Sequence, residues 1–109
     1  MDKGQKKYVA NFCRALGVRS LDKAVSVLRF RPQMLGRVEV TCIVPIYIML
    51  CERDEEQADV LYSALERSNR EDKGILMSKC LTNHVLQCVE HFEHKRIADR
   101  CNSLVQRNP

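Results

Sequence analysis

Apolar residues in the first third of the chain recur with helical spacing. They stand at positions 8, 9, 12, 13 and 16, which predicts a helix over about residues 5–16. Gly17 follows where a helix commonly ends on a left-handed residue. Ser20 then offers a side-chain oxygen to the first amides of a second helix. Pro32 ends that helix, because proline has no amide hydrogen and disfavours helical geometry in the residue before it.

The stretch from Val38 to Leu50 allows two interpretations. Apolar and polar residues alternate at its start as in a β-strand, whereas Pro45 is incompatible with a central strand. Since no second convincing strand is present to pair with it, a buried helix with Pro45 in its first turn is favoured. The alternative is a strand over residues 38–43 that pairs across a dimer.

The second half of the chain continues the helical pattern. Asp54 and Gln57 have the spacing of a capping box, which predicts a helix over residues 55–67. The polar run at 68–74 is interpreted as the principal exposed loop and the preferred site of proteolysis. Apolar residues then recur with helical spacing from 75 to 92 and from 97 to 105. Residues 1–4 and 106–109 are expected to fray.

These elements predict one all-α domain over residues 1–109, a compact bundle or short HEAT-like stack of five to six helices. A chain of 109 residues with 45% hydrophobic content can fill one core. Its aromatic content is 6% with no Trp, so the core must come from aliphatic and sulfur-containing side chains. That composition favours packed helices over an aromatic-rich β-sandwich. An α+β fold remains the alternative if residues 38–43 form a strand.

The six cysteines are interpreted as free thiols in the core. The N-terminus lacks the apolar run of a secretory signal, so we expect an intracellular protein, nuclear or cytoplasmic, whose thiols stay reduced. The longest apolar run, residues 42–51, contains a proline and is about half the length of a bilayer span. No membrane association is expected.

Metal-ligand residue types gather in one predicted helix, but their spacing does not suit a metal site. They are Cys80, His84, Cys88, His91 and His94. Zinc needs four ligands that converge on one point, and residues spread over three turns of a straight helix cannot all reach one ion. No nucleophile–base–acid arrangement and no glycine-rich phosphate loop is evident. We therefore expect no catalytic residue, no cofactor, no metal and no small-molecule substrate.

Charge is divided along the chain. Residues 1–40 hold nine Lys or Arg and three acids, residues 41–72 hold three and eight, and residues 73–109 hold six and three. This predicts a basic face and an acidic face, each suited to a charged partner. The strongest basic candidate surrounds Phe30 and comprises Arg19, Lys23, Arg29, Arg31 and Arg37. Such residues could bind phosphates and stack on bases, so nucleic-acid binding is the alternative function.

The run ALGVRSLDKAVSVLRFRPQML, residues 15–35, resembles one repeat of the mitochondrial transcription termination factor family. Its Leu-Gly turn, its helix and its Arg-x-Pro-x-Leu segment carry the resemblance. A solenoid needs several repeats and no second copy follows, so the fold is not inferred from it.

The favoured function is a non-catalytic protein–protein interaction domain, an adaptor or scaffold. It would bind a peptide or helix of a larger complex, or associate with itself. The reason is the apolar surplus between residues 38 and 50, which a small bundle does not easily bury; an uncovered apolar patch marks an interface. The residues expected there, as core or interface, are Ile43, Ile46, Tyr47 and Met49.

Overall fold

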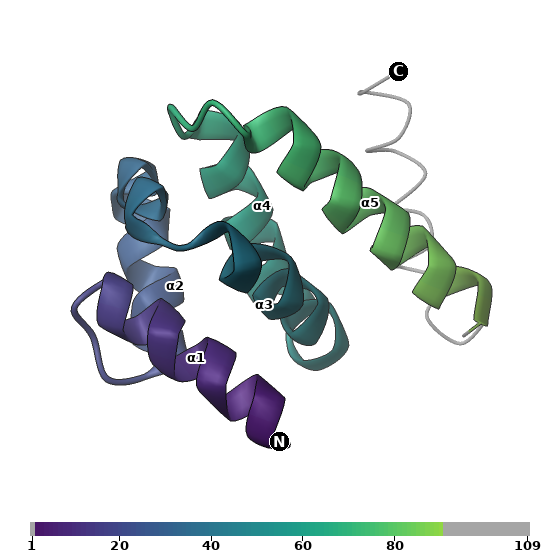
Figure 1. The fold of residues 1–109 in the computed structure, drawn as a ribbon, viewed down its shortest axis with the longest axis horizontal. Coiled ribbons are helices and arrows are strands. Elements are labelled where there is room, and N and C mark those ends of the chain that lie inside the picture. The colour runs from purple at the N-terminus through teal and green to yellow at the C-terminus, as the bar shows by residue number, and fades with distance from the viewer. Residues whose placement is uncertain (1, 91–109) are drawn as a thin grey trace.

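The computed structural model describes residues 2–90, and their side chains as far as residue 83. Over this range the chain forms five α-helices and one 3-10 helix, and no strand (Figure 1). The elements are α1 (Lys3–Ala15), α2 (Leu21–Phe30), η1 (Pro32–Arg37), α3 (Val40–Arg53), α4 (Glu55–Arg67) and α5 (Lys73–Glu90). The all-α prediction is confirmed. The strand alternative for residues 38–43 is wrong, since α3 begins within them.

The α3 helix lies at the centre of the fold. It packs against α1, α4 and α5, while α2 and η1 pack on α4. In Figure 1, α2 lies at the left of the molecule and α5 at the right. Within residues 2–90, none of the helices combines the length and apolar character that a bilayer crossing requires.

Both ends of α1 follow local capping rules. At its start, Gln5 N donates to Asp2 Oδ1 at 2.8 Å and Asp2 N donates to Gln5 Oε1 at 3.3 Å, a complete capping box. At its end Gly17 has φ 69°, and Val18 N donates to the carbonyl of Cys13. This is the left-handed termination predicted for Gly17. The sequence reasoning missed the box because it weighed only the residues from Gln5 onward.

The predicted limits of α2 are confirmed. Lys23 N donates to Ser20 Oγ at 3.2 Å, which satisfies one of the free amides at the start of the helix. Arg31 leaves helical geometry at φ −134° and ψ 71°, directly before Pro32. Pro32 then starts η1, where its missing amide hydrogen is not needed.

The α3 helix starts earlier than the sequence suggested. Pro45 is its sixth residue and lies inside the helix, so the prediction of Pro45 in the first turn is wrong. Proline has no amide hydrogen to donate to the carbonyl of Thr41 one turn before. Thr41 is exposed, and water can satisfy that carbonyl at little cost. The loss of this helical hydrogen bond is tolerated because it falls on the solvent-exposed side of α3.

The N-terminus of α4 has half of the predicted capping box. Asp54 Oδ1 accepts hydrogen bonds from the amides of Glu56 and Gln57 at 3.1 and 3.3 Å. The side chain of Gln57 does not return to Asp54; its Nε2 donates to Asp22 Oδ1 on α2 at 2.8 Å. The reciprocal half of the box is therefore replaced by a tertiary contact between α2 and α4.

The core is aliphatic, with sulfur-containing side chains and a pair of tyrosines. Tyr47 on α3 and Tyr62 on α4 pack with ring centroids 5.9 Å apart, at an interplanar angle of 49°. Four cysteines are free and buried, as the sequence predicted for them: Cys13, Cys42, Cys51 and Cys80. Cys88 and Cys101 lie outside the described side chains.

Candidate docking surface

The four residues expected at the core or an interface lie in the core of the single chain. Ile43 and Ile46 are fully buried, Tyr47 is 1% exposed and Met49 is 4% exposed. Their side chains fill the space that α3 shares with its neighbouring helices. The apolar side chains of residues 43–49 are thus buried because α3 is surrounded by other helices. None of the four predicted residues forms part of a surface patch.

The large apolar side chains that do reach solvent lie elsewhere. Among the described residues they are Phe30 at 79% exposure, Ile75 at 65% and Val40 at 47%. Phe30 is the last residue of α2, and two residues after the buried Leu28 a helix has turned by roughly 200°. Phe30 therefore points away from the core. The sequence reasoning considered Phe30 only as a neighbour of arginines, although this turn from Leu28 would have predicted its exposure.

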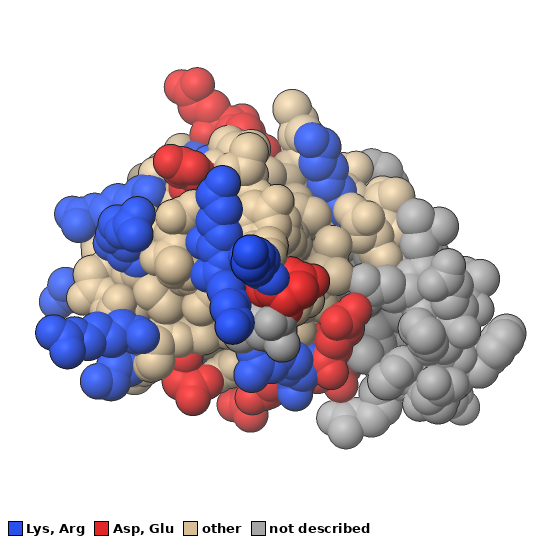
Figure 2. Space-filling model, turned by 60° about the horizontal axis from the view of Figure 1, so that its bottom comes forward, with Lys and Arg blue, Asp and Glu red and all other residues tan. Residues whose placement is uncertain are grey.

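The five predicted basic residues are all exposed and spread along α2 and η1. Arg19 and Lys23 lie near the start of α2, Arg29 and Arg31 at its end, and Arg37 ends η1. Several Lys and Arg side chains gather at the left in Figure 2, the side on which α2 lies in Figure 1. The ten residues of α2 span about 15 Å, so the two ends form separate groups.

Arg29 has an ion-pair partner on α4. Its Nη2 lies 3.4 Å from Glu56 Oε1, and the two side chains are 49% and 79% exposed. Solvent screens such a pair, and exposed ion pairs contribute only about 0–1 kcal/mol. Arg29 is therefore free to exchange this partner for another carboxylate or a phosphate.

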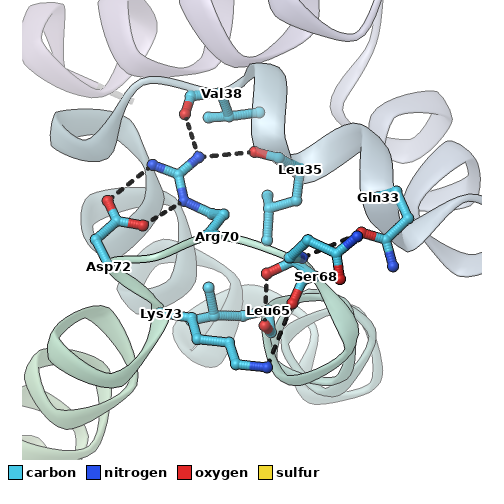
Figure 3. A network of polar contacts seen from close by, with 9 residues as sticks. Gln33, Leu35, Val38, Leu65, Ser68, Arg70, Asp72 and Lys73 are labelled. Atoms are coloured by element: carbon cyan, nitrogen blue, oxygen red, sulfur yellow. Dashed lines mark hydrogen bonds and ion pairs between the residues drawn. The ribbon is translucent and has the colours of Figure 1, made fainter.

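The polar run after α4, predicted as the principal exposed loop, does expose Asn69, Glu71 and Gly74, but it is also anchored to η1. The guanidinium of Arg70 donates through Nη1 to the carbonyl oxygens of Leu35 and Val38 at 2.9 and 2.7 Å, and it pairs with Asp72. Figure 3 shows Arg70 between these groups. The pKa of Asp72 is lowered, chiefly by its hydrogen bonds from Arg70. Arg70 donates to one carbonyl within η1 and to one directly after it, so its role is structural.

Further contacts hold the same loop. Ser68 is 1% exposed, and Lys73 Nζ donates to its carbonyl oxygen at 3.3 Å. Gln33 on η1 donates through Nε2 to the carbonyl of Arg67 at 2.7 Å and accepts from the amide of Asn69 at 3.1 Å. Figure 3 shows Gln33, Ser68 and Lys73 of this network. The Gln33 contacts hold the loop against η1, whereas the Lys73 contact ties the loop to the start of α5.

The surface has a groove at the N-terminal end of α2. It has a volume of about 430 Å³ and lies between α1, the start of α2 and the α3–α4 turn. Its lining consists of Val9, Ser20, Leu21, Asp22, Leu50, Arg53, Asp54 and Gln57. We call it the α1–α2 groove. It combines an apolar floor with two carboxylates, and it lies at the opposite end of α2 from Phe30.

Within the described part of the chain no three His, Cys, Asp or Glu side chains gather as metal ligands. Of the metal-ligand types in the sequence, Cys80 is buried in the core. The side chains of His84 and Cys88 fall outside the described ones, and His91 and His94 lie outside the described residues.

No protein-family model, curated protein or solved structure matches this chain.

Proposed function

We propose that this chain is a non-catalytic protein-interaction domain that contacts its partner through Arg29, Phe30 and Arg31, here called the Phe30 tip. The 79% exposure of Phe30 carries this proposal. Aromatic and arginine side chains dominate the binding energy of protein interfaces, whereas an exposed phenylalanine contributes nothing to the fold of the free chain. The tip therefore replaces residues 43–49 as the proposed interface.

The helix before Phe30 supports a docking role. Ser26 lies one turn before Phe30 on the same face of α2, is exposed and is small enough to let a partner approach. The ends of this face carry cations, which favour a partner with acidic groups around an apolar pocket. The buried Ala24, Val25 and Leu28 hold the backbone of α2 against the core, so little backbone entropy is lost on binding.

A photo-crosslinking amino acid in place of Ser26 tests this function inside cells that express the protein. We expect a crosslinked protein whose yield falls at least tenfold when Phe30→Asp is added. Ile75→Asp is the matched control, since it removes another exposed apolar side chain, and it should leave the yield unchanged. The proposal would be refuted if no crosslinked protein formed, or if Phe30→Asp left the crosslink yield unchanged.

Nucleic-acid binding is the second candidate, and the exposure of all five predicted cations favours it. Phe30 would stack on an unpaired base while Arg29, Arg31 and Arg37 contact phosphates. Binding of a labelled single-stranded oligonucleotide should then weaken steeply as salt rises. Arg29→Glu with Arg31→Glu should abolish it. Arg53→Glu with Lys79→Glu makes the same charge change on α3 and α5 and should leave binding intact; equal losses in both variants would indicate non-specific attraction.

A further inference from the structure

We infer that the partner of the Phe30 tip is a second copy of this chain, which receives Phe30 in its α1–α2 groove. This inference rests on the proposed function and names the partner. The contact is head to tail: each copy offers its tip to one neighbour and its groove to another.

The floor of the α1–α2 groove suits an aromatic ring. Val9 on α1 and Leu21 on α2 are half-buried and supply the accessible apolar surface, while Leu50 on α3 lines the groove but is buried in the core. The volume of about 430 Å³ lies within the ~300–1,000 Å³ of pockets that hold whole small molecules, so the groove has room for one phenyl ring. Burying Phe30 there would remove the largest exposed apolar side chain in the described part of the chain.

Charge favours the same pairing. Two carboxylates, Asp22 and Asp54, line the groove beside one cation, Arg53, and the exposed Arg19 and Lys23 flank its lining residues on the α2 side. The α3–α4 turn continues this acidic surface, since four of the five residues from 52 to 56 are Asp or Glu. The tip brings two guanidinium groups on either side of Phe30. An arginine of the tip can thus meet a carboxylate of the groove while the ring enters the apolar floor.

Both carboxylates of the groove are held in position. Asp54 Oδ1 caps α4 by accepting from two amides, and Asp22 Oδ1 accepts from Gln57. A preorganised acceptor does not have to be ordered when the guanidinium arrives, which favours binding. The Gln57–Asp22 contact, which replaces half of the predicted capping box, thus shapes the groove.

The position of the two surfaces decides the kind of assembly. Tip and groove lie at opposite ends of α2, about 15 Å apart along its axis, and use different residues. One copy can therefore engage two neighbours, and such a heterologous contact generates rings or open chains. One aromatic side chain and its flanking arginines cover far less than the ~800 Å² per partner of a standard interface. The assembly should be weak, dependent on concentration and sensitive to salt.

The test is a complementation of two variants by light scattering and sedimentation. The tip variant carries Phe30→Asp; the groove variant carries Val9→Lys and Asp22→Arg, with Asp22→Arg alone as a milder version if the pair unfolds. We expect the average mass of the unchanged chain to rise with concentration and to fall again in high salt. Each variant alone should stay monomeric. Their equimolar mixture should form a dimer and nothing larger, because only one intact tip and one intact groove remain.

The other outcomes are decisive. If the mixture stays monomeric while the unchanged chain assembles, the contact is not between tip and groove. If the tip variant assembles normally, Phe30 is not part of the interface. If the unchanged chain is a monomer at every concentration, self-association is excluded, whereas a Phe30-dependent crosslink from position 26 to a different protein would still support the proposed function. Ile75→Asp should assemble like the unchanged chain.

Discussion

The guanidinium of Arg70 and the carboxylate of Asp72 form a two-point ion pair, with Nε to Oδ1 at 2.8 Å and Nη2 to Oδ2 at 3.0 Å. This geometry fixes the plane of the guanidinium and directs Nη1 at the carbonyls of Leu35 and Val38. Asp72 immediately precedes α5, so the pair ties the start of α5 to the end of η1. Two elements more than thirty residues apart in sequence are joined through one side chain.

Arg70→Ala should lower the free energy of unfolding by about 2–4 kcal/mol, because the carbonyl of Val38 and the carboxylate of Asp72 lose this donor, and the carbonyl of Leu35 keeps only the amide of Val38. The side chain of Arg70 is only 10% exposed, so water cannot easily take its place. Urea denaturation followed by circular dichroism measures the change. Arg67→Ala removes an exposed arginine on α4 and should cost less than about 0.5 kcal/mol. Equal costs for the two variants would contradict the structural role of Arg70.

Asp72 should make the fold sensitive to acid. Its pKa in the folded protein is lowered below 3.8, chiefly by the hydrogen bonds from Arg70. The ionised group therefore contributes stability above its ordinary pKa, and this contribution is lost as pH falls through that value towards the lower pKa of the folded state. The difference in unfolding free energy between the unchanged protein and Asp72→Asn should be constant near neutral pH and shrink below about pH 4.

Arg70→Met provides the control for this pH dependence. Without the guanidinium, Asp72 loses the group that contributes most to lowering its pKa, so adding Asp72→Asn to Arg70→Met should change the acid profile much less than Asp72→Asn does in the unchanged protein. An equally large effect of Asp72→Asn in both backgrounds would show that Arg70 is not the group that holds the carboxylate ionised.

The buried cysteines should resist alkylation in the folded state. Burial raises the pKa of Cys80 to about 12, with a smaller contribution from nearby Cys51, and burial also raises the pKa of Cys13. At a pH near the ordinary thiol value of ~8.5 these groups stay protonated and unreactive. Mass spectrometry after maleimide treatment should find Cys13 and Cys80 unlabelled until denaturant is added. Thr82→Cys, an exposed position on α5, should be labelled at once.

Ile46→Ala tests the placement of α3 at the centre of the core. Ile46 is fully buried, and its truncation should lower the free energy of unfolding by about 2–5 kcal/mol through lost burial and the cavity that remains. Val40→Ala, on the same helix at 47% exposure, should cost less than about 1 kcal/mol. Thermal melts of both variants measure the difference. Similar losses would mean that this face of α3 is not the packed one.

The caps and breaks of the helices could be predicted from the sequence because they depend on atoms a few residues apart. Ser20, Pro32 and Asp54 each act on amides within three residues of themselves, and Gly17 acts through its own backbone freedom. The limits of α2 and α4 followed from these residues with little error. Helix caps and breaks follow the same local chemistry in any fold, so they can be predicted without knowing which helices pack together.

Contacts between residues far apart in the sequence decided how the helices pack and which side chains are buried. The sequence could not show that Gln57 would bond to Asp22 instead of closing a capping box, or that Arg70 would reach one carbonyl within η1 and one directly after it. Nor could it decide whether Ile46 and its neighbours formed a core or an interface, because burial depends on which helices surround α3. The sequence by itself determined the class of fold and the ends of several helices. Only the packing of α3 among its neighbours decided that its apolar side chains are enclosed while Phe30, at the outer end of α2, is left to contact solvent.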